Sequence, residues 1–180
     1  MLKTDENPDC CFLQSAAQGD KRSFGVLYER YLNEIYRYVF FKVGNRQAAE
    51  DITEETFIKT WESLSRIYQG DGKIDNLHAW LYRIAKNLVI DFYRKNKPES
   101  IVGPTIPAKL LSPEETAIDQ EQITRIMNAL QKMKPDLQQI IILRLINDLS
   151  HREIASIIGI SEAHSRILLC RALKKLKEIL

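Results

Sequence analysis

The clearest structural signal in the chain is the segment Leu149-Ser150-His151-Arg152-Glu153-Ile154-Ala155-Ser156-Ile157-Ile158-Gly159-Ile160-Ser161. Ser150 and Glu153 stand three residues apart, so each side chain can hydrogen-bond the backbone N–H of the other in a capping box that begins a helix. Gly159 permits the left-handed backbone that ends this helix, and Ser161 can cap a second one. The segment therefore predicts a short helix, a tight turn and the start of another helix.

The second of these helices is basic. Its five basic side chains are Arg166, Arg171, Lys174, Lys175 and Lys177. A short helix, a glycine turn and a basic helix are typical of a DNA-binding helix-turn-helix. An ordinary helical hairpin with a solvated basic face gives the same pattern, and the segment alone leaves both interpretations open.

The composition is that of a helical protein with unevenly distributed charge. With 180 residues, 44% of them hydrophobic, the chain can bury one sizeable core or two small ones. Its seven glycines and six prolines cluster between apolar periodic segments, which favours helices over a sheet with many turns. The net charge of +2 does not argue for nucleic acid, but residues 46–62 are mainly acidic and residues 83–97 mainly basic. Such separate surfaces can bind a protein and DNA, respectively.

No sequence feature indicates an exported, membrane-inserted or catalytic protein. Cys10, Cys11 and Cys170 form no disulfide framework, and the N-terminus lacks the apolar core of a signal peptide. The most apolar run, residues 140–146, is too short to span a bilayer. No P-loop, HExxH or clustered Cys/His motif occurs. We therefore expect a cytoplasmic protein with no catalysis, no metal, no cofactor and no membrane insertion.

Apolar periodicity predicts an all-α protein of two small helical domains. Apolar residues spaced three and four positions apart predict three helices. These cover residues 20–44, about 46–65, and 76–97. Asp20 and Asn76 are suited to cap the first and third, and whether Asn33 breaks the first is left open. Two further helices, the second with Pro135 in its first turn, precede the helix-turn-helix.

The predicted organisation has four parts. Residues 98–118 contain prolines and have no sustained period, which is typical of a semi-rigid linker. The parts are an N-terminal extension (1–19), a first domain (20–97), the Pro-containing linker (98–118) and a second domain (119–180).

Three segments, in this order, resemble the extracytoplasmic-function (ECF) sigma factors of the sigma-70 family. They are Ala49–Trp61, Ala79–Asp91 and Leu149–Lys177. In the family, they correspond to the polymerase-binding helix, the helix for the downstream promoter element and the helix-turn-helix for the upstream element. The resemblance covers about Asp20 to Leu180.

This resemblance implies a transcription initiation factor whose partners are core RNA polymerase, promoter DNA and an anti-sigma factor. The first domain is expected to capture the opened downstream (−10) element, and the second domain to read the upstream (−35) element. The linker is expected to thread the polymerase channel, although a passive tether fits its residues equally well.

The implied polymerase-binding residues lie on the first of the three segments. They are Asp51, Glu54, Glu55, Thr56 and Lys59. Asp51, Glu54 and Glu55 fall within about one helical turn, which gives the helix an acidic outer face. A solvated helix face is the plainer interpretation of the same carboxylates.

The implied downstream-element residues flank the loop between Ser65 and Asn76. Pulling a base out of the duplex costs a few kcal/mol, and stacking in a pocket returns about 1–3 kcal/mol per base. The residues expected to hold the flipped base are Tyr68, Gln69, Asp71, Lys73 and Asn76, and those expected to hold the DNA strand are Arg83, Lys86, Asn87, Arg94 and Lys95. Trp80 is expected in the core, and Tyr82 is expected to be more exposed.

The implied upstream-element residues lie on the basic helix. They are Ser161, Ala163, His164, Arg166, Ile167, Arg171 and Lys174. The family usually carries polar residues where this chain has Ile167 and Leu168. An exposed Ile167 can touch a thymine methyl but cannot replace a bidentate arginine. We therefore expect few polar base contacts and more dependence on phosphates and DNA shape; whether His164 contacts DNA stays open.

Two other functions fit parts of the pattern. One is a free-standing helix-turn-helix regulator whose N-terminal bundle senses a ligand or dimerises. The acidic and basic helices argue against it, because the face of a dimer should be more apolar. The other is a nucleic-acid enzyme, which ranks last because the usual catalytic motifs are missing.

Overall fold

The structure, a computed structural model, describes residues 9–70, 72, 74–95 and 120–180. Every regular element within these ranges is a helix, which confirms the predicted all-α fold. The elements are α1 (Cys10–Ala17), α2 (Lys21–Val43), α3 (Arg46–Gln69), α4 (Leu77–Lys95), α5 (Gln120–Gln131), α6 (Pro135–Ile141), the π-helix η3 (Ile142–Ile146), α7 (His151–Ile158) and α8 (Glu162–Ile179). None of the helices in these ranges has both the length and the apolarity needed to cross a membrane.

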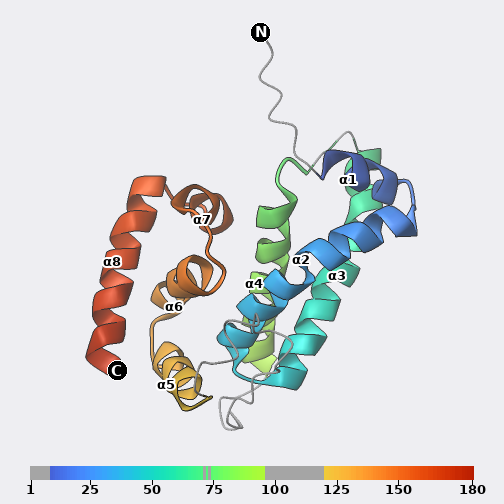
Figure 1. The fold of residues 1–180 in the computed structure, drawn as a ribbon. Helices are drawn as coiled ribbons and strands as arrows, with labels where there is room; N and C mark the ends of the chain where they lie inside the picture. The colour runs from blue at the N-terminus through green and yellow to red at the C-terminus, as the bar shows by residue number, and fades with distance from the viewer. Residues whose placement is uncertain (1–8, 71, 73, 96–119) are drawn as a thin grey trace.

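Helices α1 to α4 pack together as a first bundle (Figure 1). The side chain of Asp20 caps α2 by accepting from the backbone N–H groups of Arg22 and Ser23. Gly44 ends α2 in the left-handed region, with φ of 69°. Both ends of this helix were predicted, and α2 continues through Asn33 without a break.

Helix α1 forms within the segment predicted only as an extension. Asp9, which is 2% exposed, pairs with the Arg30 guanidinium and accepts a hydrogen bond from the Tyr31 hydroxyl. Leu13 and Ala16 are buried on the same face of α1, against α2 and α3. Their three-residue spacing is the sequence signal for this helix. The first bundle therefore has four helices, because the extension supplies apolar side chains to its core.

Helix α3 is longer than predicted. It runs to Gln69, so Tyr68 and Gln69 are helical and do not belong to the predicted loop. The backbone N–H of Gly72 then bonds the Ile67 carbonyl and turns the chain back toward α4. Asn76 caps α4 as predicted, its Oδ1 accepting from the Ala79 N–H.

Helices α5 to α8 form the second part of the chain. Pro135 occupies the first turn of α6, as predicted. The π-helix η3 continues α6 directly and was not predicted. The linker at 98–118, and with it the expected path through a polymerase channel, lies outside the described residues.

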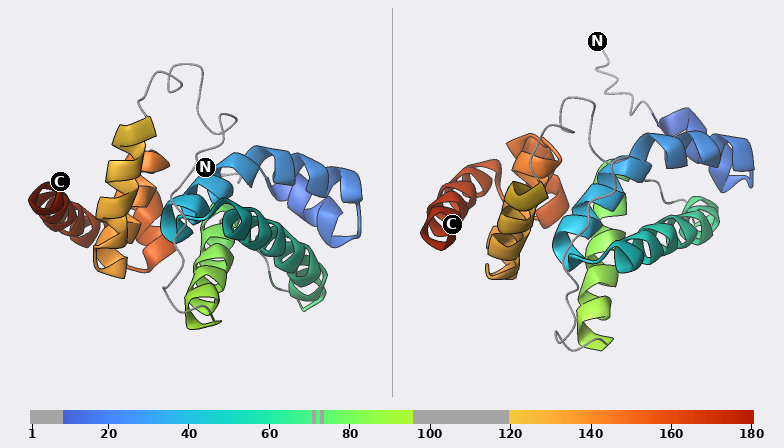
Figure 2. Two further views of the ribbon diagram at one scale, coloured as in Figure 1. Left: turned by 90° about the horizontal axis from the view of Figure 1, so that it is seen from below. Right: turned by 60° about the horizontal axis from the view of Figure 1, so that its bottom comes forward.

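The two parts of the chain contact each other (Figure 2). Helix α7 packs on α4, and both η3 and α5 pack on α2. Their buried side chains belong to one continuous hydrophobic cluster. In Figure 1, α6 and α7 lie between α8 and the first bundle. The domain boundaries at 19/20, 97/98 and 118/119 stay predictions.

Lys42, near the end of α2, is buried where the two parts meet and is 6% exposed. Its ammonium group donates to the Pro135 carbonyl at 3.2 Å and to Gln138 Oε1 at 3.1 Å. Burial, and after it the charge of nearby Lys86, lower the pKa of this ammonium group from 10.5 to about 8, while Asp136 opposes the shift.

Replacing Leu13 by Ala tests whether α1 is part of the folded core. The fully buried side chain would leave a cavity, so Leu13→Ala should lower the free energy of unfolding by about 2–5 kcal/mol in urea titrations. Gln14→Ala changes an exposed neighbour on the same helix and is the matched control. Equal stability of the two variants would contradict the place of α1 in the core.

Lys42 also predicts a pH dependence of stability. Between pH 8 and 10 the unfolded chain holds this proton more tightly than the folded chain, because the folded pKa is the lower one. The free energy of unfolding should therefore rise by about 2 kcal/mol across this range. Lys42→Met should flatten the rise in urea titrations at each pH, whereas Lys59→Met, at an exposed position on α3, should keep it. The same slope in both variants would exclude a depressed pKa at Lys42.

Candidate protein and nucleic-acid interfaces

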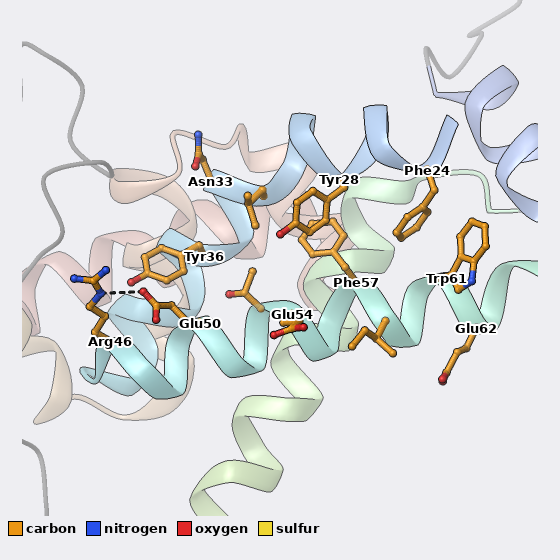
Figure 3. Close-up of a pocket in the computed structure, with 13 residues that line it drawn as sticks. Phe24, Tyr28, Asn33, Tyr36, Arg46, Glu50, Glu54, Phe57, Trp61 and Glu62 are labelled. Atoms are coloured by element: carbon orange, nitrogen blue, oxygen red, sulfur yellow. Dashed lines mark hydrogen bonds and ion pairs between the residues drawn. The ribbon is translucent and has the colours of Figure 1, made fainter. Parts of the chain in front are cut away.

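An apolar groove of about 660 Å³ runs between α2 and α3 (Figure 3). Two aromatic pairs join its walls: Phe24 meets Trp61 with ring centroids 5.0 Å apart, and Tyr28 meets Phe57 at 4.8 Å. Tyr28 and Ile58 are large apolar side chains that remain exposed, at 36% and 48%. An aromatic groove of this kind is suited to the apolar face of a partner helix.

The groove has an acidic rim. Glu50, Glu54 and Glu62 line it, and Glu50 pairs with Arg46 at 2.8 Å. Burial raises the pKa of the Tyr36 hydroxyl in the groove wall, and Glu50 adds to the shift. The hydroxyls of Tyr36 and Thr53 are buried and have no hydrogen-bond partner among the described residues. The groove therefore combines an apolar centre, negative charge and two unsatisfied hydroxyls.

The structure divides the predicted polymerase-binding residues among three environments. Glu54 lines the groove. Asp51, Glu55 and Lys59 are exposed and do not line the groove, and Lys59 pairs with Glu55 at 3.1 Å. Thr56 is fully buried, and its hydroxyl donates to the Ile52 carbonyl at 2.7 Å. The prediction that Thr56 contacts a partner is therefore wrong, since its side chain is used inside the helix bundle.

The groove itself was not predicted from the sequence. The sequence predicts Phe57 and Trp61 as core positions, because their spacing matches the apolar stripe of α3. Exposed Tyr28 and Ile58 lie on two different helices, and only their packing brings them to one groove. A sequence signal did exist: Ile58 is an apolar residue beside the apolar stripe of α3, within a mainly acidic segment.

Helix α4 presents a polar stripe. Arg83, Asn87 and Arg94 are exposed and point within about 60° of one another around the helix axis. The predicted residues Lys86 and Lys95 flank this stripe. A stripe of this kind can follow a phosphate backbone. Arg83 is engaged in the present arrangement, where its Nη2 donates to the Ser156 carbonyl of α7 at 3.1 Å.

Tyr82 does not belong to this exposed stripe. It is completely buried, in edge-on contact with Tyr38 at 5.1 Å between ring centroids. Burial raises the pKa of its hydroxyl well above the usual value, and the Glu34 carboxylate contributes to the shift. The expectation of an exposed Tyr82 is therefore wrong. Trp80 packs partly buried against the core, in agreement with the prediction.

The predicted pocket for a flipped base is only partly described. The Tyr68 hydroxyl hydrogen-bonds the backbone of Ile74, and Gln69 Nε2 donates to Ser65 Oγ at 3.0 Å. Asn76 uses its side-chain oxygen to cap α4. Asp71 and Lys73 lie outside the described residues. The described part thus places Tyr68 and Gln69 at the end of α3, beside the start of the loop.

The helix-turn-helix forms as the sequence predicts. The Ser150 hydroxyl and the Glu153 carboxylate make the capping box, and Gly159 ends α7 with φ of 81°. Ser161 caps α8 by accepting from the His164 N–H at 3.1 Å. His151 Nδ1 and Ser165 Oγ, 2.9 Å apart, join the two helices. Ser161 thus has a structural role in positioning the helix.

Helix α8 has a continuous exposed face on the side opposite its buried residues. Ala163, Ile167, Cys170 and Lys174 are exposed and share one stripe opposite buried Ser165 and Ala172. Ile167 is 53% exposed, as its predicted outward position requires. His164, Arg166 and Arg171 flank the stripe, and Arg166 pairs with Glu162. Cys170 is the residue of this face that sequence reasoning missed.

Comparisons with known proteins match both parts of the chain. The family profile for Sigma-70 region 2 matches residues 27–99, and that for Sigma-70 region 4 matches residues 123–176. RNA polymerase sigma factor YlaC of Bacillus subtilis is 30% identical over 161 residues, which cover 84% of this chain and 88% of YlaC. This chain belongs to the sigma-70 family, in its ECF group.

The sigma factor also matches ECF RNA polymerase sigma factor BldN of Streptomyces coelicolor, with 31% identity over 173 residues. That match covers 93% of this chain but 64% of BldN, so the chain spans less than two thirds of that relative. The structure of CnrH in complex with the cytosolic domain of CnrY has the same fold, with a TM-score of 0.72, 24% identity and coverage of 95% and 96%. The relatives are transcription factors and not enzymes.

Proposed function

We propose that the sigma factor binds core RNA polymerase through the groove between α2 and α3 and directs the enzyme to promoters through α4 and α8. The observation that carries the proposal is the separation of two kinds of surface on one chain. An apolar groove with an acidic rim is suited to a protein helix. The polar stripe on α4 and the exposed face of α8, which Arg166 and Arg171 flank, are suited to DNA.

The polymerase surface is proposed to include residues beyond the predicted acidic face. Tyr28 and Ile58 provide exposed apolar area that a partner can bury. Glu50, Glu54 and Glu62 favour a partner helix with basic residues beside its apolar face. Asp51, which accepts from Gln47 Nε2, extends the acidic rim toward the outer side of α3.

The two DNA surfaces are proposed to act at different promoter elements. Arg83, Asn87 and Arg94 would follow the strand of the opened downstream element, with Lys86 and Lys95 beside them. The face of α8 around Ile167 would enter the major groove of the upstream element, with Arg166 and Arg171 on the phosphates. Ile167 favours contact with a thymine methyl.

Three further properties follow from family membership. Regulation by an anti-sigma factor is proposed because one matched structure is that of the sigma factor RpoE in complex with the anti-sigma factor NepR from Bartonella quintana. The chain itself is proposed to act in the cytoplasm. It is also proposed to have no catalytic activity of its own.

Charge and apolar changes in the groove test the polymerase surface. Glu54→Lys and Ile58→Ser should each weaken binding to core RNA polymerase about tenfold or more, because they introduce repulsion and remove exposed apolar area, respectively. Binding is measured by titrating core enzyme with the labelled chain. Glu29→Lys, at an exposed position on α2 outside the groove, is the matched charge reversal.

The same titration separates the groove from the outer acidic face. If Glu54→Lys and Ile58→Ser bind as tightly as Glu29→Lys, the groove is not the polymerase surface. Weakening confined to the double variant Asp51→Lys and Glu55→Lys would assign binding to the outer side of α3. No binding by the unaltered chain would overturn the proposed function.

The exposed thiol of Cys170 gives a test of the upstream surface. In a chain with Cys10→Ser and Cys11→Ser, a bulky maleimide adduct on Cys170 should fill the space that the major groove needs. Transcription from genomic fragments by the reconstituted holoenzyme should then fall at least about tenfold. The control is the reverse arrangement, Cys170→Ser with adducts on Cys10 and Cys11. Full transcription with modified Cys170 would remove this face of α8 from the DNA interface.

A further inference from the structure

The groove between α2 and α3 has an aromatic end and a polar end. The two helices run antiparallel here, since successive ring contacts advance by four residues along α2 and retreat by four along α3. Figure 3 shows Trp61 toward one end of the groove, and Tyr36 beside Glu50 toward the other. A partner helix therefore meets different chemistry at the two ends of the groove.

Two buried hydroxyl groups belong to the lining of this groove. Tyr36 is 8% exposed and Thr53 is 2% exposed, and neither hydroxyl has a hydrogen-bond partner among the described residues. Other buried threonines of α3 use their hydroxyls within the helix: Thr56 donates to the Ile52 carbonyl, and Thr60 donates to the Thr56 carbonyl at 2.8 Å. Thr53 lies one turn from these positions, yet its own helix leaves its hydroxyl unused.

A buried hydroxyl without a partner destabilises the chain that carries it. Its desolvation is not offset by a hydrogen bond, and native structures keep few such groups. Tyr36 and Thr53 both line a groove that is suited to a partner helix. A partner that supplies the missing hydrogen bonds therefore gains binding free energy from groups that are unsatisfied in the unbound chain.

An exposed ion pair lies beside the Tyr36 hydroxyl. Arg46 Nε and Glu50 Oε1 are 2.8 Å apart, and the two side chains are 60% and 44% exposed. Burial, and after it the charge of Glu50, raise the pKa of the Tyr36 hydroxyl, so this group keeps its proton and can donate at neutral pH. An exposed pair contributes little to stability, and interface side chains commonly change rotamer on binding. A partner side chain can therefore displace the pair and reach the hydroxyl.

The chemistry of the site favours a neutral polar side chain. The Tyr36 hydroxyl can donate, and the Thr53 hydroxyl can donate or accept. A carboxamide supplies an acceptor oxygen and a donor nitrogen together. Glu50 and Glu54 disfavour a carboxylate, and a buried cation beside two neutral hydroxyls would lose its hydration without a paired charge. An asparagine or glutamine side chain meets these requirements, while the acidic rim can bind basic residues that stay in water.

We propose that the Tyr36 and Thr53 hydroxyls form a recognition site for one asparagine or glutamine side chain, carried by the helix of core RNA polymerase that occupies the groove. This inference deepens the proposed function and rests on it. The aromatic end of the groove binds apolar side chains of the same helix. The recognition site thus fixes the direction and register of the helix, and it selects among helices of similar apolarity.

Removal of single hydroxyls tests the recognition site. Tyr36→Phe keeps the buried ring, and Thr53→Val keeps the branched shape of the side chain. Each should weaken binding to core RNA polymerase about fivefold or more in titrations with the labelled chain, because the carboxamide of the partner is left unpaired. Neither should lower the free energy of unfolding in urea titrations, because the unbound chain loses no hydrogen bond.

Tyr38→Phe and Thr60→Val are the matched controls. The Tyr38 hydroxyl is also buried with no partner among the described residues, but Tyr38 does not line the groove. Thr60 is likewise buried on α3 outside the groove. Both controls should bind core enzyme as the unaltered chain does. Binding of Tyr36→Phe and Thr53→Val as tight as that of the controls would overturn the recognition site, as would weaker binding that merely follows a loss of stability.

Photocrosslinking identifies the side chain that enters the site. Benzoylphenylalanine in place of Tyr28, a partly exposed aromatic residue of the groove, should attach the chain to one helix of core enzyme. Alanine is then substituted for each polar residue of that helix. One asparagine or glutamine should be coupled to Tyr36→Phe, so that both changes together weaken binding no more than either alone. Coupling only to a charged residue, or to none, would contradict the carboxamide assignment.

The two proposals fail in different measurements. If Glu54→Lys and Ile58→Ser weaken binding while Tyr36→Phe and Thr53→Val do not, the groove remains the polymerase surface and the recognition site is overturned. If the unaltered chain does not bind core enzyme, both proposals are overturned.

Discussion

A buried ammonium group that is hydrogen-bonded to acceptors on the other part of the chain links the two parts of this molecule. Lys42 belongs to the first bundle, yet both acceptors of its ammonium group, at Pro135 and Gln138, belong to the second part. Its carbonyl accepts from Gln131 as well. Separation of the two parts would break all three of these bonds.

This constraint relates the three proposed interfaces to one another. The groove between α2 and α3 is open while the two parts of the chain are in contact, whereas Arg83 of α4 is engaged by α7. A partner protein can therefore reach its surface before the DNA surfaces are separated.

Local sequence signals predicted the helices well and their environments less well. The caps at Asp20, Ser150 and Ser161 depend on side chains close in sequence, and all three form as predicted. Thr56 and Tyr82 were misjudged, because helical spacing gives a direction around an axis but not which directions another helix covers. Helix α1 was missed because two apolar residues and one buried aspartate are a weak signal without their partners on α2.

The sequence by itself determined the all-α fold, the ends of most helices, the helix-turn-helix and the family, because these depend on the order and spacing of nearby residues. The tertiary structure alone decided that α1 completes the first bundle, that Tyr28 and Ile58 meet in one groove with Glu54, and that Asn147 reaches Tyr82. Each of these joins residues from different helices. Such contacts depend on how helices pack, and the periodicity of a single helix carries no information about the element that faces it.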